Sequence, residues 1–245
     1  MTPRDKPASR LIVALDFDSL PRALDLAKKL AGLGVMFKIG SQLYTSEGPR
    51  AMSEMAALGA GIFLDLKYHD IPNTVAGAVL TAAGMPGVEL INVHALGGRA
   101  MLEAAAQAIR AGQPVGAEGP RLLAVTILTS MDQKAMAEVG ISGSPSRGAV
   151  RLATLAKKSG VDGVVASVKE ARLIRKACGK SFLIVTPGVR PATGEKVKKD
   201  DQSRVATPAE AIQAGADYIV VGRPITGAAD PRAATQAILE EFQKA

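Results

Sequence analysis

The chain is poor in aromatic residues and in cysteine. Only 3% of its 245 residues are Phe, Tyr or Trp, and Trp is absent. So few rings leave little for nucleic-acid bases to stack on, and we therefore expect no nucleic-acid partner. The single cysteine, Cys178, cannot form a disulfide within the chain, which is typical of proteins in a reducing compartment.

Long apolar runs are also missing. No run approaches the 18 residues that a membrane-spanning helix requires. Residues 1–9 are polar and contain two prolines, so they do not resemble a signal peptide. We expect a cytoplasmic protein without membrane contact. The net charge of +7 is compatible with an ordinary basic surface or with an anionic substrate, and charge alone does not decide between them.

Hydrophobic residues are abundant, at 47% of the chain, and they fall into short runs. These runs are rich in Val, Ile and Leu without polar alternation, which is typical of strands buried on both faces of a parallel sheet. Amphipathic stretches separate them. Eight such units in about 250 residues predict one (β/α)8 TIM-barrel domain over residues 1–245, with an open doubly wound sheet as the alternative. The runs are Leu11–Leu15, Val35–Ile39, Ile62–Leu66, Leu90–Val93, Leu122–Leu128, Val161–Ala166, Phe182–Val185 and Tyr218–Val221.

Charged side chains stand where several of these runs end. In a barrel, the carboxyl ends of the strands carry the catalytic groups. Asp16 follows the first run, Lys38 lies in the second, and Asp65 and Lys67 lie at the end of the third. Arg223 follows the eighth. Because charges at an apolar barrel rim are costly unless they are paired, this clustering favours a functional site.

The third run continues into a segment whose polar side chains are expected to point in different directions. Asp65 and Lys67 are two residues apart in a predicted strand, so their side chains should point the same way. Asp70 is out of step with them, must lie in the following loop, and is free to reach a neighbouring subunit. His69 has the parity of Asp65, so it is either a general acid or base or a histidine of the rim, and we favour the second interpretation.

A magnesium site is one alternative for these carboxylates. Asp16, Asp65 and Asp70 are ligands of the kind that Mg²⁺ prefers. However, Lys38 and Lys67 would place positive charge beside the ion, and no His/Cys spacing indicates zinc. We therefore predict that the site holds no metal.

A phosphate site is also predicted at the barrel mouth. The loops after strands seven and eight are the usual phosphate site of TIM barrels, and here they carry Arg190, Gly222 and Arg223. Glycine lets the backbone approach an anion, and arginine can bind phosphate through two hydrogen bonds. The long stretch Gly188–Ala206 follows strand seven and is expected to act as a lid or binding loop.

The motifs resemble those of the orotidine 5′-phosphate decarboxylase family. Residues 65–74, DLKYHDIPNT, resemble its signature D-x-K-x-x-D-I-P-x-T. The resemblance extends over nearly the whole chain, although the stretch between Arg190 and Gln202 is a few residues longer than usual and richer in lysine. The other matching segments, in family order, are Leu15-Asp16, Lys38–Gly40, Leu128–Met131, Thr186–Pro191, Asp201-Gln202 and Val221–Ile225.

This resemblance implies an activity and a set of roles. The family converts orotidine 5′-monophosphate into UMP and CO2, as a homodimer and without a cofactor. Lys38, Asp65 and Lys67 would form a charged array that Asp70 of the partner subunit completes, and Lys67 would stabilise and protonate a carbanion at C6. The binding residues it implies are Asp16 and Thr74 for the ribose (Thr74 from the partner), Thr129, Ser130 and Pro187 for the pyrimidine, and Arg190, Gln202, Gly222 and Arg223 for the phosphate.

Two other functions remain as alternatives. A sister enzyme of the same barrel type, the Mg²⁺-dependent 3-keto-L-gulonate-6-phosphate decarboxylase or hexulose-phosphate synthase, carries an acidic residue where this chain has Lys38. A non-catalytic phosphate-binding barrel would have no use for two carboxylates that face an anion. Both are disfavoured.

Overall fold

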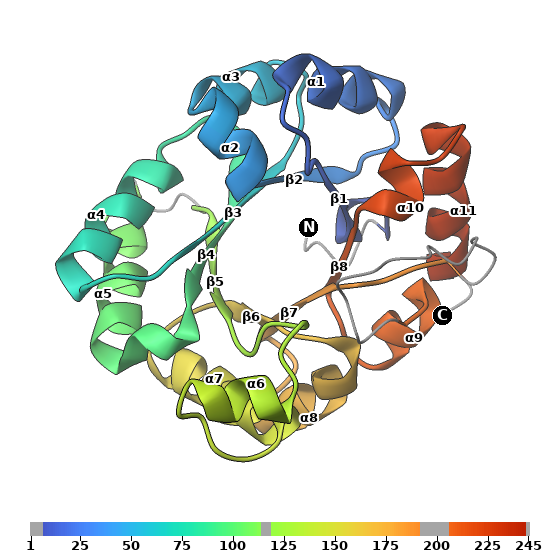
Figure 1. The fold of residues 1–245 in the computed structure, drawn as a ribbon. Coiled ribbons are helices and arrows are strands. Elements are labelled where there is room, and N and C mark those ends of the chain that lie inside the picture. Colours follow the sequence, from blue (N-terminus) through green and yellow to red (C-terminus); the bar gives the residue numbers. More distant parts are fainter. Residues whose placement is uncertain (1–6, 114–118, 192–205, 244–245) are drawn as a thin grey trace.

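Eight parallel strands close into a barrel in the computed structural model, which describes residues 7–113, 119–191 and 206–243 (Figure 1). Each strand pairs with the next along the chain, and the last pairs with the first. The predicted (β/α)8 barrel is confirmed, and the open doubly wound sheet is wrong. The strands are β1 Leu11–Ala14, β2 Met36–Gly40, β3 Ile62–Tyr68, β4 Val88–His94, β5 Arg121–Val125, β6 Gly163–Val165, β7 Leu183–Pro187 and β8 Tyr218–Val221.

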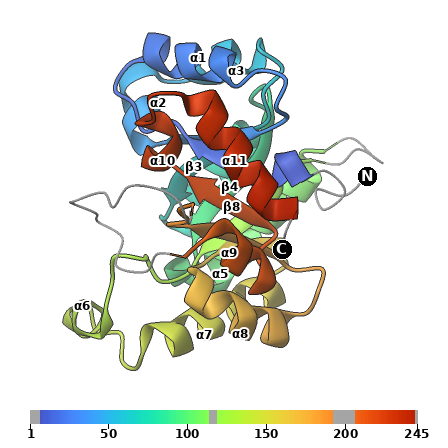
Figure 2. The ribbon, with the colours of Figure 1, turned by 90° about the vertical axis from the view of Figure 1, so that its right-hand side faces the viewer.

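Helices form a ring outside the barrel, because their apolar faces cover the outward side chains of the strands (Figure 1). Figure 2 shows α6 projecting at the end where the strands finish, opposite the 3₁₀ turn at Pro7–Arg10. No helix among the described residues is long and apolar enough to cross a membrane. The helices are α1 Leu20–Lys29, α2 Ser41–Glu47, α3 Arg50–Ala56, α4 Pro72–Ala83, α5 Gly98–Ala111, α6 Gln133–Glu138, α7 Pro145–Lys158, α8 Val168–Cys178, α9 Pro208–Gln213, α10 Arg223–Thr226 and α11 Pro231–Gln243.

Some predicted boundaries were wrong by a few residues. The fifth strand was expected to continue to Leu128 but ends at Val125, and the next residue, Thr126, donates its hydroxyl proton to the carbonyl of Val165. Helix α7 begins at Pro145. The hydroxyl of Ser144 accepts the N–H of Arg147 there, which satisfies one of the free donors of the first turn.

The barrel interior is filled by alternate residues of the strands. The deeper positions are apolar, for example Met36, Phe63 and Leu90. Two residues further along the same strands, the side chains are Lys38, Asp65 and Asn92. Because the side-chain period of a strand is two, these polar groups lie directly above the apolar layer, at the carboxyl end of the barrel.

Candidate active site

A row of four charged side chains crosses the carboxyl ends of β1, β2 and β3. The Nζ atom of Lys38 lies 2.8 Å from Oδ1 of Asp16 and 3.3 Å from Oδ2 of Asp65. The other oxygen of Asp65, Oδ1, lies 2.7 Å from Nζ of Lys67. The two lysines thus bind opposite oxygens of one carboxylate, and the charges alternate along the row.

Lys38 is the buried member of this row. Burial by itself would lower the pKa of the Lys38 ammonium, but the carboxylates of Asp65 and Asp16 outweigh it and hold that pKa above its usual value. Lys38 therefore stays protonated at neutral pH and fixes the two carboxylates on either side of it.

Lys67 has an unusual backbone conformation. Among the residues that the structure describes, it is the only one other than glycine with a positive φ, at 52°. The pairing of β3 with β4 shifts register between Leu64 and Tyr68, around this residue. A left-handed conformation in a residue with a side chain costs about 1–3 kcal/mol and persists only where the surroundings impose it. The expected proximity of Asp65 and Lys67 is confirmed, although the strand is irregular between them.

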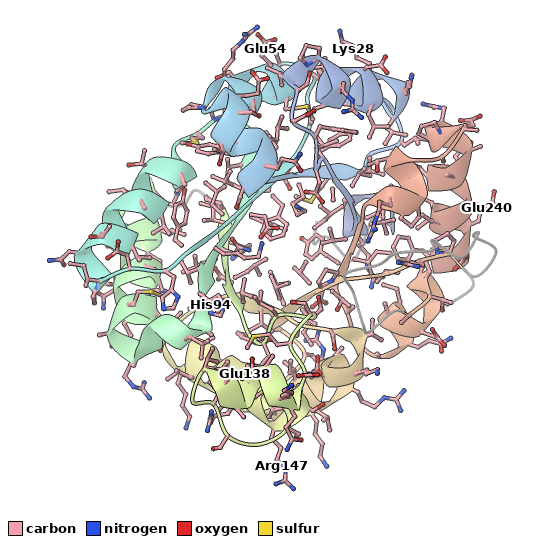
Figure 3. The ribbon with its side chains drawn as sticks, in the orientation of Figure 1. Lys28, Glu54, His94, Glu138, Arg147 and Glu240 are labelled. Atoms are coloured by element: carbon pink, nitrogen blue, oxygen red, sulfur yellow. The ribbon has the colours of Figure 1, made fainter. Side chains whose placement is uncertain are left out.

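The two histidines lie beside the row. His69 is exposed and stacks on His94, with ring centroids 5.3 Å apart and an angle of 18° between the planes. Figure 3 shows His94 at the end of β4, on the side of α5. Burial, with smaller contributions from His69 and Lys67, lowers the pKa of His94 to about 4, so His94 is neutral at pH 7. The geometry favours the rim interpretation for His69, because neither histidine lines the cavity described next.

A cavity of about 550 Å³ opens at this end of the barrel. The charged row forms one side, Arg190 and Arg223 contribute to its lining from the loops after β7 and β8, and apolar residues such as Val125 and Val220 contribute to it from the barrel interior. The stem of the long loop is fixed, because the N–H of Arg190 donates to the carbonyl of Ala206 at 2.9 Å. The cavity therefore combines an apolar surface with charged groups, which suits an organic anion.

Most of the predicted site residues meet in this cavity. Those that line it are Asp16, Lys38, Asp65, Lys67, Thr129, Pro187, Arg190, Gly222 and Arg223. Ser130, Asp70 and Thr74 are exposed and do not line it. The carboxylate of Asp70 accepts the N–H of the next residue, Ile71, at 2.6 Å. Gln202, the lysines at 196, 198 and 199 and most of the predicted lid lie outside the described residues.

Asn92 is a site residue that the sequence analysis missed. Its side chain is completely buried and bonds both Asp65 and Lys67. One signal was available, because an amide inside the apolar run Leu90–Val93 needs a buried polar partner.

The geometry also bears on the magnesium alternative. Within residues 7–113, 119–191 and 206–243, no three acidic, His or Cys side chains are grouped so that they could hold a metal ion. Asp16 and Asp65 flank the ammonium of Lys38, and Asp70 is not part of the cavity lining. A cation of the protein itself therefore lies between the two carboxylates.

The fold and the cavity first define a class. The molecule is a (β/α)8 barrel whose lysines and carboxylates alternate at the carboxyl ends of its first strands, which is where such barrels carry out catalysis.

More specifically, the chain belongs to the orotidine 5′-phosphate decarboxylase / HUMPS family, whose family model matches residues 9–238. It is 54% identical to the orotidine 5′-phosphate decarboxylase of Trichlorobacter lovleyi, over 98% of this chain and 97% of the relative. The corresponding protein of Geotalea uraniireducens is 50% identical over the same shares. The family expected from the motifs is confirmed.

Solved structures agree with this assignment. The crystal structure of orotidine 5′-phosphate decarboxylase from Lactobacillus acidophilus superposes with a TM-score of 0.84 at 39% identity, covering 96% of this chain and 99% of the other. An uncharacterized conserved protein from Geobacillus kaustophilus gives a TM-score of 0.82 at 41% identity, covering 95% and 99%. The similarity to these solved structures therefore extends over the whole barrel.

Proposed function

We propose that this protein is a carboxy-lyase that converts orotidine 5′-monophosphate into UMP and CO2, the last step of de novo pyrimidine biosynthesis. The observation that carries the proposal is the row of Asp16, Lys38, Asp65 and Lys67 at one side of the cavity. The names of relatives about 50% identical over nearly the full length support it. The reaction needs no metal or organic cofactor, because the row itself supplies both the fixed charges and the proton.

The ends of the cavity define how the substrate is oriented. Arg190 and Arg223 bind the 5′-phosphate, because guanidinium groups form paired hydrogen bonds with phosphate oxygens. The backbone at Gly222 and the side chain of Gln202 complete the phosphate site. The pyrimidine lies on the apolar floor, where Pro187 and Thr129 contact it. Ser130, the exposed residue next to Thr129, would have to turn towards the ring when the substrate binds. Asp16 then reaches the ribose between the two ends.

The charged row acts on the carboxylate at C6. The substrate carboxylate is directed towards Asp65 and the partner's Asp70, and two like charges about 4 Å apart repel by about 4 kcal/mol at an effective dielectric of 20. The bond between C6 and the carboxylate carbon breaks, and its electron pair stays on C6. The nearby ammonium of Lys67 stabilises this carbanion and transfers a proton to it. Lys67 then recovers its proton from solvent.

The two lysines are not equivalent in this proposal. Lys38 is buried between two carboxylates and holds them in place. Both lysines line the cavity, but Lys67 is more exposed and pairs with only one carboxylate. A proton donor must reach the reacting atom, and Lys67 meets that requirement better.

The protein acts as a homodimer in which Asp70 and Thr74 serve the site of the partner subunit. Both are exposed and lie outside the cavity of their own chain. Ile71, directly after Asp70, is also 67% exposed, so a second subunit placed against Asp70 would cover it. A twofold axis close to β3 would supply Asp70 of each subunit to the other. The location is cytoplasmic, which agrees with the single, buried cysteine.

One assay separates the proposal from its alternatives. The purified protein is mixed with orotidine 5′-monophosphate, and the loss of substrate absorbance is followed with and without EDTA. We expect the same rate in both. No loss of orotidine 5′-monophosphate, together with turnover of 3-keto-L-gulonate 6-phosphate that EDTA abolishes and Mg²⁺ restores, would indicate the metal-dependent sister enzyme. Unchanged absorbance together with retained binding of UMP would indicate a phosphate-binding barrel without catalysis.

A further inference from the structure

Asn92 makes two hydrogen bonds to the charged row from inside the barrel. First, its Oδ1 accepts the backbone N–H of Lys67 at 2.8 Å, and second, its Nδ2 donates to Oδ1 of Asp65 at 2.6 Å. The residue belongs to β4, its side chain is completely buried, and it does not line the cavity. It contacts two residues of the row without reaching the place of the substrate.

The first bond explains how the backbone of Lys67 is held. The register shift between β3 and β4 takes this N–H out of the regular ladder. A buried N–H needs an acceptor, and the side chain of Asn92 provides one in place of the backbone of β4. The left-handed conformation of Lys67 is therefore tied to Asn92.

The second bond fixes the carboxylate of Asp65. Oδ1 of Asp65 accepts hydrogen bonds from Nδ2 of Asn92 and from Nζ of Lys67, while Oδ2 of Asp65 forms the ion pair with Lys38. The amide is neutral, so it orients the carboxylate without adding a third cation. Rotation of the Asp65 side chain would break the bond to Asn92 as well as both ion pairs.

We infer that Asn92 is a positioning residue that fixes Lys67 and Asp65 relative to each other for the chemical step. This inference rests on the proposed function for its catalytic consequence. Asn92 itself donates no proton to the substrate. Its contribution is geometric, and a displacement of about 1 Å at a reacting group can lower the rate by about a hundredfold.

Two substitutions separate the two bonds. Asn92→Leu has a similar shape and removes both. Asn92→Asp keeps an acceptor for the N–H of Lys67 but cannot donate to Asp65 while it is ionised. As a matched control, Thr186→Val changes a fully buried hydroxyl in β7 that has no hydrogen-bond partner among the described residues. All variants are compared with wild type for urea stability and UMP binding, which report folding and the phosphate site.

The kinetic test uses steady-state decarboxylation of orotidine 5′-monophosphate. We expect Asn92→Leu to lower kcat by about a hundredfold while KM changes much less, because the groups that bind the phosphate are untouched. Thr186→Val should retain the wild-type kcat. In Asn92→Asp, the new carboxyl lies against the carboxylate of Asp65, which Lys67 and Lys38 hold in place, so at low pH the two carboxyls share a proton and a donor is regained. Its kcat relative to wild type should therefore rise as the pH falls.

A crystal structure of Asn92→Leu tests the inference independently of turnover. We expect the φ of Lys67 to leave the left-handed region, or the Asp65 carboxylate to rotate away from Lys67. A folded variant with both unchanged would overturn the inference, as would a wild-type kcat. If the wild-type protein failed to decarboxylate the substrate, the proposed function would fall, and this structure would still decide whether Asn92 positions the two residues.

Discussion

Replacing Lys38 by Met should destabilise the protein more than replacing Lys67 by Met, although both lysines belong to the same charged row. Methionine keeps much of the length and volume of the lysine stem and removes the charge. The side chain of Lys38 is 11% exposed and lies between two carboxylates, whereas that of Lys67 is 39% exposed and pairs with one. The comparison therefore separates stability from chemistry within one site.

The magnitude follows from what each substitution leaves behind. Removing one partner of a buried ion pair costs about 3–5 kcal/mol, because the other charge stays buried. Asp65 keeps its bonds to Lys67 and Asn92, and the side chain of Asp16 is 59% exposed and can be hydrated. We therefore expect the lower end, about 3 kcal/mol, for Lys38→Met. A half-exposed pair contributes about 1 kcal/mol or less, so Lys67→Met should lose no more than that.

Urea unfolding at pH 7 measures both variants against wild type, with the m value checked for constancy. The pH dependence of the free energy of unfolding gives a second test of the role of Lys38. Because the pKa of Lys38 is raised above 10.5, its stabilising effect is complete below that pH and is lost as the pH rises through the folded-state value. The difference in the free energy of unfolding between wild type and Lys38→Met should thus shrink in strong alkali. Equal losses for the two variants, or a stabilised Lys38→Met, would refute the reasoning.

Three further predictions concern the partner subunit, the barrel floor and the phosphate site. Lys67→Ala and Asp70→Ala should each be inactive. Unfolding and refolding the two variants together should restore about a quarter of wild-type activity, because half of the dimers are mixed and each mixed dimer has one intact site. No recovery of activity would contradict the shared site. Burial, followed by the charges of Glu89 and Asp217, raises the pKa of Tyr218 to about 12. Between pH 10 and 12 the wild type should therefore lose about 2 kcal/mol of stability that Tyr218→Phe does not lose, as measured by urea titrations at each pH. Parallel pH profiles of stability for the two proteins would argue against this. Arg223→Gln should lower kcat/KM for orotidine 5′-monophosphate by about a hundredfold, the effect of losing a charged hydrogen bond, while leaving the turnover of phosphate-free orotidine unchanged; an equal loss for both substrates would place Arg223 elsewhere in the mechanism.

The barrel was predictable from the sequence because its strands are continuous apolar runs. A strand such as Leu11–Ala14 is buried on both faces, so its composition alone reveals it. Strand ends were less predictable, since the apolar residue Ile127 follows β5 without belonging to it. An apolar residue can be buried by the strand ladder or by a loop, and composition does not separate the two.

The site was predictable where strands are regular and less so where β3 departs from regularity. Position near the strand ends correctly grouped Lys38 and Asp65 at the barrel mouth. Parity gave His69 the same direction as Asp65, but the left-handed turn at Lys67 changes the course of the chain, and His69 is exposed. Asn92 escaped notice because one amide in an apolar run acquires its meaning only from partners on another strand.

The most direct test of the central claim is the rate of CO2 release from orotidine 5′-monophosphate by Lys67→Ala under single-turnover conditions. Lys67 is the more exposed of the two lysines that line the cavity beside Asp65, and in this account it both stabilises the carbanion and protonates it. We predict a loss of several orders of magnitude relative to wild type, with UMP binding retained. Release of CO2 by Lys67→Ala at the wild-type rate would contradict the account.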